Sequence, residues 1–174
     1  MRRDEAGAAT IEFCLLFPLV FSIFLMFVEL SMVQFYRVAL ERGTETAARA
    51  VRLNTDNAPT PEQLKTVVCD AAFILSECLT YTRVGLERID PATWVSTGGS
   101  SADADCYDQA DPDSPPRNFD SGSSNDLVLM RTCKLFRPYF PTTLLGSRLA
   151  KHNNGFYAIV TTTVLVMEPT EEIS

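Results

Sequence analysis

The chain has few of the residues from which catalytic and metal sites are built. Its 174 residues include a single histidine, His152, which lies between Lys151 and Asn153 in a predicted turn. The cysteines that follow the N-terminal apolar segment are nine, 28 and 27 residues apart, so no Cys-x-x-Cys zinc knuckle is present. A nucleophile elbow and a phosphate-binding glycine loop are also missing. We therefore expect a protein that is not an enzyme and that holds no cofactor or metal.

Positive charge is scarce as well. The 15 lysines and arginines are outnumbered by 22 aspartates and glutamates, giving a net charge of -7, which argues against nucleic-acid binding. Residues 96–126 are rich in glycine, serine, proline and aspartate, a loop composition. The aspartates lack the Asp-x-Asp-x-Asp-Gly order of a calcium loop; they are Asp103, Asp105, Asp108, Asp111 and Asp113. The sequence thus favours a solvated insertion over a calcium site.

Charge is absent altogether from residues 13–28, and the apolar character resumes over residues 30–36. About 20 apolar residues suffice to cross a hydrocarbon core of ~30 Å. A secretory signal peptide would be followed by a small-x-small cleavage site, and residues 29–34 offer none. We expect a single-pass anchor that stays attached to the rest of the chain. Glu29 is expected near the far interface, where its side chain reaches water, and is assigned no role.

Glu12 lies at the near end of the segment, and a charge at the centre of a membrane costs roughly 2.5 to 3.5 kcal/mol. Its surroundings, Gly7-Ala8-Ala9-Thr10-Ile11-Glu12-Phe13, resemble the class III signal of type IV pilins. Together with Pro18 and Glu29 they resemble the TadE/TadF-like minor pilins (pseudopilins) of the tight-adherence (Tad, or Flp) type IV pilus. Residues 157–167 and the following Glu168-Pro169 resemble the closing strand of TadE-like proteins.

The resemblance implies cleavage after Gly7 by a prepilin peptidase, which leaves Ala8 as the mature N-terminus. Glu12 would then pair with the positive α-amino group of a neighbouring subunit and set the register of assembly. Phe13 stands where major Flp pilins carry tyrosine, and those pilins are very short, so the resemblance implies a minor subunit. Its implied partners are other pilin subunits, the Tad inner-membrane assembly platform and the peptidase.

The orientation in the bacterial inner membrane also follows from the resemblance. Positive-inside counting slightly favours the opposite orientation, because Arg2 and Arg3 precede the segment whereas four arginines follow it within residues 37–52. The pilin-like signal requires a cytoplasmic N-terminus, and most cysteines lie downstream of the segment. We expect a leader over residues 1–7, a transmembrane helix over 8–36, and a periplasmic stalk and head over 37–174.

The five cysteines divide into one inside the apolar segment and four beyond it. Cys14 is predicted to be a small packing residue. The even number of cysteines beyond the segment indicates two disulfides formed in an oxidising periplasm, and three pairings are possible. These cysteines are Cys69, Cys78, Cys106 and Cys133. Pairing Cys106 with Cys133 would staple the polar loop to a strand. Cys69 would then pair with Cys78, which requires the intervening helix to end or kink near Leu75, since nine helical residues separate Cα atoms by about 13 Å.

Two helices are predicted. The first runs over residues 8–53, about 69 Å at 1.5 Å per residue, with Gly43 as its weakest point. The second begins at Thr60-Pro61-Glu62 and continues to residue 75 with an apolar face.

Three strands are predicted over residues 80–89, 126–136 and 156–167. The last is apolar on both alternating faces, which indicates a central or well-covered strand. Trp94 and the aromatic residues within 137–141 are expected to pack in the core. The predicted fold is α+β: a long N-terminal transmembrane and stalk helix, a second amphipathic helix, and a small, mostly antiparallel sheet of about three strands with a disulfide-tethered loop.

Two functions from different classes fit these features. The first is a minor pilin that takes part in assembly of a Tad pilus used in surface adhesion; the polar loop, residues 98–124, would then be a contact element whose deletion abolishes adhesion but not assembly. A type II secretion pseudopilin is a related alternative. The second is a signal-anchored periplasmic binding or scaffold domain that is not incorporated in a filament.

Overall fold

The computed structural model describes residues 6–54, 57–94, 119–149 and 155–169. Backbone proximity divides the chain into two compact units, and we describe each by itself. The first unit comprises residues 1–34 and 137–157, and the second comprises residues 35–136 and 158–174. The elements follow one another as α1, α2, α3, β1, β2, α4 and β3. The long apolar helix, the further helix and the three-stranded antiparallel sheet confirm the predicted α+β class.

The first helix, α1, spans Ala6–Leu53 and is 48 residues long. It contains Pro18, whose ring removes one backbone donor. Ser22 Oγ donates to the carbonyl of Pro18 at 2.7 Å. The helix also continues through Gly43, the residue predicted to be its weakest point. Gly43 is a contact position: an added Cβ would lie 2.6 Å from the carbonyl oxygen of Val68 on the second helix.

The second helix, α2 (Pro61–Ala71), begins as its sequence predicts. Thr60 Oγ1 accepts from the backbone N–H of Gln63, and the Gln63 side chain accepts from the N–H of Thr60, which is a capping box. The helix ends at Ala71 rather than near residue 75. This early end allows Cys69 to reach Cys78, with Cα atoms 5.6 Å apart, in the predicted disulfide. A short helix, α3 (Cys78–Tyr81), then occupies the first positions of the predicted strand.

The sheet has the order β1-β2-β3 and belongs mainly to the second unit. Strand β1 (Thr82–Ile89) pairs antiparallel with β2 (Leu127–Phe136), from Thr82 opposite Lys134 to Ile89 opposite Leu127. Strand β3 (Tyr157–Val166) runs antiparallel to β2, since Met167 N–H donates to the carbonyl of Asp126 at the start of β2. Two of the three strands thus agree with prediction to within one residue, and β1 begins two residues late.

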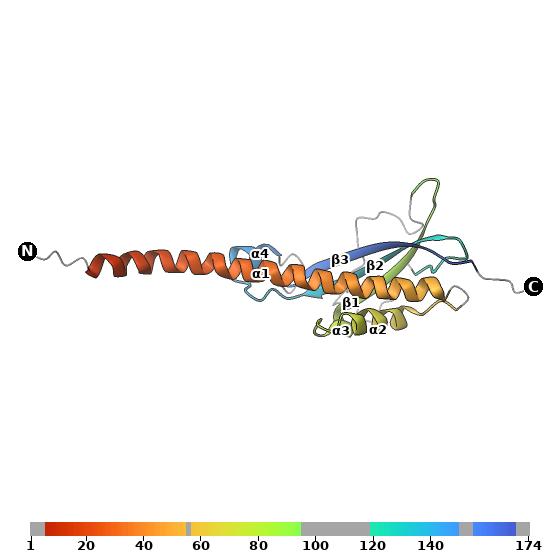
Figure 1. The fold of residues 1–174 in the computed structure, drawn as a ribbon, viewed down its shortest axis with the longest axis horizontal. Coiled ribbons are helices and arrows are strands. Elements are labelled where there is room, and N and C mark those ends of the chain that lie inside the picture. Colours follow the sequence, from red (N-terminus) through yellow and green to blue (C-terminus); the bar gives the residue numbers. More distant parts are fainter. Residues whose placement is uncertain (1–5, 55–56, 95–118, 150–154, 170–174) are drawn as a thin grey trace, which may run out of the picture. The chain divides into compact units, whose positions relative to one another are not determined.

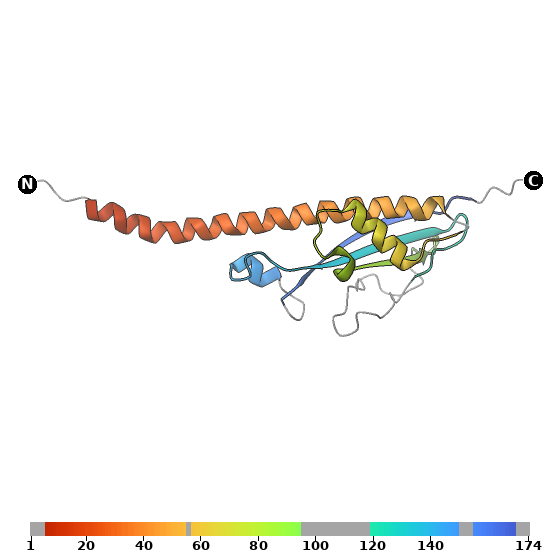
Figure 2. The ribbon, with the colours of Figure 1, turned by 90° about the horizontal axis from the view of Figure 1, so that it is seen from below.

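The predicted central position of β3 is wrong, because β2 is the central strand and β3 lies at the edge. Its side chains alternate strictly: Ile159, Thr161 and Leu165 are buried, whereas Val160 and Val164 are exposed. Valines on the outer face give the sequence its two-sided apolar appearance. Figures 1 and 2 both show the C-terminal half of α1 running beside β3.

The core of the second unit lies between the sheet and the helices. Its buried side chains come from α1, α2 and all three strands: Leu40, Ala47, Val51, Leu64, Val68, Val84, Leu86, Val128, Met130, Ile159 and Leu165. One polar contact crosses this core, between Thr44 Oγ1 on α1 and Thr161 Oγ1 on β3, 2.8 Å apart. At the end of α1, Arg52 Nε lies 2.9 Å from Glu168 Oε1, so an ion pair joins the helix to the second residue after β3.

Candidate functional site

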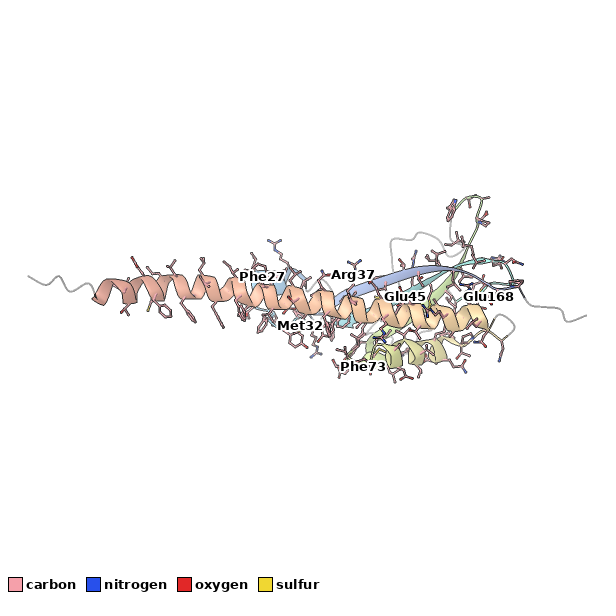
Figure 3. The ribbon with its side chains drawn as sticks, in the orientation of Figure 1. Phe27, Met32, Arg37, Glu45, Phe73 and Glu168 are labelled. Atoms are coloured by element: carbon pink, nitrogen blue, oxygen red, sulfur yellow. A yellow bond between two sulfur atoms is a disulfide. The ribbon has the colours of Figure 1, made fainter. Side chains whose placement is uncertain are left out.

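The N-terminal half of α1 presents apolar side chains on all sides. It is the one helix of the described residues that is long and apolar enough to cross a membrane. Its exposed side chains include Phe13, which stacks on Phe17, and Phe17 in turn stacks on Phe21, with ring centroids 5.2 and 5.6 Å apart. Phe27 and Met32 also project away from the helix (Figure 3). A surface of this kind requires lipid or other helices as its surroundings.

Glu12 is an exposed carboxylate within this apolar surface. Its immediate neighbours Ile11 and Phe13 are exposed as well. Glu12 forms no hydrogen bond or ion pair with any residue that the structure describes. Gly7 and Ala8, the predicted processing site, lie in the first turns of α1.

Glu29 is the position at which the structure overturns the sequence-based expectation most clearly. Its side chain does not extend to water and is 0% exposed. Its carboxylate accepts two backbone hydrogen bonds, from the N–H of Tyr139 to Oε1 at 3.2 Å and from the N–H of Phe140 to Oε2 at 2.9 Å. Hydrogen bonds from N–H groups to a carboxylate are among the stronger ones in proteins. Glu29 thus fastens a distant part of the chain to α1.

The part that Glu29 holds is residues 137–149, which we call the 137–149 segment. A tight turn at Phe140 leads into the short helix α4 (Leu144–Leu149). Thr143 closes this turn: its Oγ1 donates to the carbonyl of Phe140 at 2.8 Å and accepts from the N–H of Gly146 at 3.1 Å. Gly146 is required there, because an added Cβ would lie against the carbonyl oxygen of Phe140.

Two of the three aromatic residues expected in the core are on the surface instead, and the third, Phe140, is half-buried. Tyr139 is 56% exposed and Trp94 is 74% exposed, so the core-packing prediction is wrong for both. Arg137, at the start of the 137–149 segment, lies over the ring of Phe156 at 4.6 Å from its centroid. The segment therefore exposes the ring of Tyr139 directly beside its contact with Glu29 on α1.

A second buried charge, Lys134 on β2, supports the disulfide-closed turn of the second unit. Its Nζ donates to the carbonyls of Ser76 and Glu77 at 3.0 and 3.3 Å and faces the rings of Tyr81 and Phe136. Only 2% of Lys134 is exposed. Desolvation lowers the pKa of its ammonium group from 10.5 to about 8, although the nearby Glu77 carboxylate opposes the shift.

Of the remaining cysteines, Cys133 agrees with the predicted pattern, whereas Cys14 is exposed and is not packed within the described chain. Cys133 is disulfide-bonded, but Cys106 lies outside the described residues, so its pairing with Cys133 stays a prediction. Cys14 is free and exposed on α1. The aspartate-rich stretch and His152 also lie outside the described residues. Within the described ranges, no group of three histidine, cysteine, aspartate or glutamate side chains is placed to hold a metal ion.

Sequence reasoning located Glu12 but missed the function of Glu29. Both are carboxylates at the ends of one apolar run, and the spacing alone does not distinguish them. A signal was present in residues 137–141, where two prolines flank two aromatic residues and leave amide N–H groups without helical or strand partners.

The family model of TadE-like proteins matches residues 7–49. This match confirms the resemblance seen in the N-terminal residues and includes Gly7, Glu12 and Glu29. The sheet and the 137–149 segment lie outside the matched range. No curated protein and no solved structure matches the chain significantly.

Proposed function

We propose that this chain, whose N-terminal segment is TadE-like, is a minor pilin that takes part in assembly of a Tad pilus used in surface adhesion. In this proposal α1 anchors the chain in the inner membrane with its N-terminus in the cytoplasm and its stalk and head in the periplasm. The role is structural, and the partners are other pilin subunits and the assembly platform. Prepilin peptidase removes residues 1–7 by cutting after Gly7.

The observation that carries the proposal is the exposed, unpartnered Glu12 inside an apolar helix surface. An isolated carboxylate is costly in lipid, whereas a carboxylate paired with a neighbouring subunit's α-amino group is neutralised. Cleavage after Gly7 would create such an amino group four residues before Glu12. The exposed side chains of Ile11 and Phe13 would then pack against the neighbouring helix.

The processing step is tested by the N-terminal sequence and intact mass of the protein from cells with and without active prepilin peptidase. A mature chain that begins at Ala8 only in the presence of the peptidase supports the proposal. A chain that begins at Met1 in both strains contradicts it and favours the signal-anchored scaffold domain.

The assembly step is tested by the substitution Glu12→Ala, with Glu41→Ala as the matched control on the same helix. Glu41 is exposed, and among the described residues its ion-pair partner is Arg37, four residues away, at 3.2 Å. We expect Glu12→Ala to lose co-purification with the other pilin subunits while membrane insertion and the Cys69–Cys78 disulfide are retained. Unchanged co-purification of Glu12→Ala would refute the register function of Glu12.

A further inference from the structure

The 137–149 segment has the properties of a membrane-surface element, and the first of these is its position on the chain. Glu29 lies directly after the charge-free residues 13–28 and binds the backbone of Tyr139 and Phe140. On α1, side chains are exposed at every position from residue 9 to residue 24, and partial burial begins at Leu25 and Met26, one turn before Glu29. The segment is thus fastened to α1 at the first residue beyond the charge-free stretch.

The second property is a turn at Phe140 in which several backbone polar groups have partners within the segment or on Glu29. Non-helical backbone is tolerated near hydrocarbon only where its N–H and C=O groups have partners. The N–H groups of Tyr139 and Phe140 donate to Glu29, and the carbonyl of Phe140 accepts from both the N–H and Oγ1 of Thr143. The N–H of Gly146 donates to Thr143 Oγ1. The need for an acceptor for these N–H groups explains why the carboxylate of Glu29 is fully buried at the end of an apolar stretch.

The third property is the surface that the segment presents. Leu144 is 69% exposed, and the ring of Tyr139 is exposed as well. Tyrosine is enriched at membrane interfaces, where its ring meets apolar chains and its hydroxyl meets water. The segment carries two arginines and no acidic residue, although the whole chain has a net charge of -7. Arg137 and Arg148 are both exposed, and a basic surface of this kind attracts anionic lipid headgroups.

We infer that the 137–149 segment docks on the membrane surface, with Leu144 and Tyr139 entering the lipid and the two arginines binding anionic phospholipid headgroups. The inference rests on the proposed membrane anchor but not on pilus assembly or on processing. It assigns Glu29 a positioning function, because Glu29 holds the segment at the depth of the interface. Docking of the segment would fix the part of α1 around Glu29 at the bilayer surface.

The experiment uses the full chain in vesicles of phosphatidylcholine and phosphatidylglycerol that contain lipids brominated at shallow and at deep positions of their acyl chains. Trp94 is the only tryptophan, so Trp94→Phe provides a silent background for a reporter, Leu144→Trp. We expect the L144W emission to shift to shorter wavelength and to lose most of its intensity to bromine quenching. The substitution is conservative because Leu144 is exposed.

Two reporters on α1 separate the docking from the anchoring. Leu19→Trp lies within the charge-free stretch, and Leu53→Trp lies at the end of the helix; both side chains are exposed. Docking predicts quenching of L19W and L144W but not of L53W. Quenching of L19W without quenching of L144W would overturn the docking and leave the anchor intact. Absence of quenching in L19W would overturn both.

The choice of lipid as the partner is tested in two further ways. Arg148→Gln should reduce the quenching of L144W in vesicles that contain phosphatidylglycerol and should have little effect in pure phosphatidylcholine, with Arg49→Gln as the control. An equal response in both lipids would overturn the headgroup assignment. An emission shift of L144W that appears only at high protein-to-lipid ratio would identify a second copy of the chain as the partner and would overturn the membrane docking.

Discussion

Glu29 and Phe140 lie 111 residues apart in the sequence and are joined by a hydrogen bond of 2.9 Å from the Phe140 N–H to the Glu29 carboxylate. The bond links a helix that has the composition of a membrane anchor to a turn between the last two strands of the chain. It also explains the position of a charged residue that the apolar pattern alone leaves unexplained.

Substitution of Glu29 should release the 137–149 segment. Glu29→Ala leaves the N–H groups of Tyr139 and Phe140 without an acceptor, and an unsatisfied buried donor costs about 1 to 3 kcal/mol. We expect local opening to become easier by about 2 kcal/mol, which accelerates hydrogen exchange of these two amides by about 30-fold.

Two variants sharpen this test. Glu29→Gln keeps one acceptor oxygen and should fall between the wild type and Glu29→Ala. Glu41→Ala removes only an exposed i,i+4 pair with Arg37, which contributes about 0.5 kcal/mol or less, and should leave both amides protected. Equal protection of the two amides in Glu29→Ala and the wild type would show that the carboxylate does not hold the segment.

Gly43→Ala should destabilise the second unit even though alanine favours helix. The added Cβ would lie 2.6 Å from the Val68 carbonyl oxygen and 3.3 Å from the Cβ of Ala72. Overpacking costs about 1 to 3 kcal/mol, which exceeds the gain of at most ~1 kcal/mol in helix propensity. The free energy of unfolding of the full chain in detergent micelles should fall, whereas that of the exposed-site control Glu45→Ala should not. A more stable Gly43→Ala would mean that α1 and α2 do not approach each other this closely.

The sequence predicts the elements whose signals are local. The helix start at Thr60-Pro61, the continuous apolar helix and the β-branched run of the last strand all depend on neighbours within a few residues, and their predicted positions agree with the structure to within one or two residues. The Cys69–Cys78 disulfide is the pair that remains when Cys106 is assigned to Cys133; it requires the helix to end before Cys78, and α2 does end at Ala71.

The features that escape prediction depend on contacts between distant residues. The burial of Glu29 requires knowledge of a turn that lies 110 residues away. The edge position of β3 is hidden because Val160 and Val164 make its solvent face resemble a core face. From the sequence alone, Gly43 is predicted to weaken the helix; its contact with the carbonyl of Val68 is visible only in the structure.

Loss of the Cys69–Cys78 disulfide should weaken the second unit. The bridge joins two cysteines nine residues apart. For a loop of this length, the loss of chain entropy in the unfolded state stabilises the fold by about 2 to 3 kcal/mol. The double substitution Cys69→Ser and Cys78→Ser should therefore lower the free energy of unfolding by about this amount. Cys14→Ser, at the free and exposed cysteine, is the matched control and should have no effect. A double variant as stable as the wild type would show that Lys134 and the surrounding core suffice to hold the turn.

Lys134 should make the stability of the second unit dependent on alkaline pH. Its pKa is about 8 in the folded chain and 10.5 without the burial. Between these values the unfolded chain binds more protons than the folded chain, so the free energy of unfolding rises as the pH rises through this interval. Below pH 8 both states carry the charge, and its desolvation cost is fully present. Because the hydrogen bonds of Lys134 offset part of this cost, we expect the free energy of unfolding to rise by about 1 to 2 kcal/mol between pH 8 and pH 10.5.

The variant Lys134→Met tests the origin of this dependence. Methionine fills a similar volume without a charge, so the rise in stability from pH 8 to pH 10.5 should disappear. Denaturant unfolding at a series of pH values measures the difference between the two proteins, which cancels the contributions of tyrosines and other lysines. If the wild type and Lys134→Met showed the same pH profile, the ammonium group would not be desolvated beneath the turn at Ser76 and Glu77. A lower stability of Lys134→Met at all pH values would show instead that the two carbonyl hydrogen bonds outweigh the cost of burying the charge.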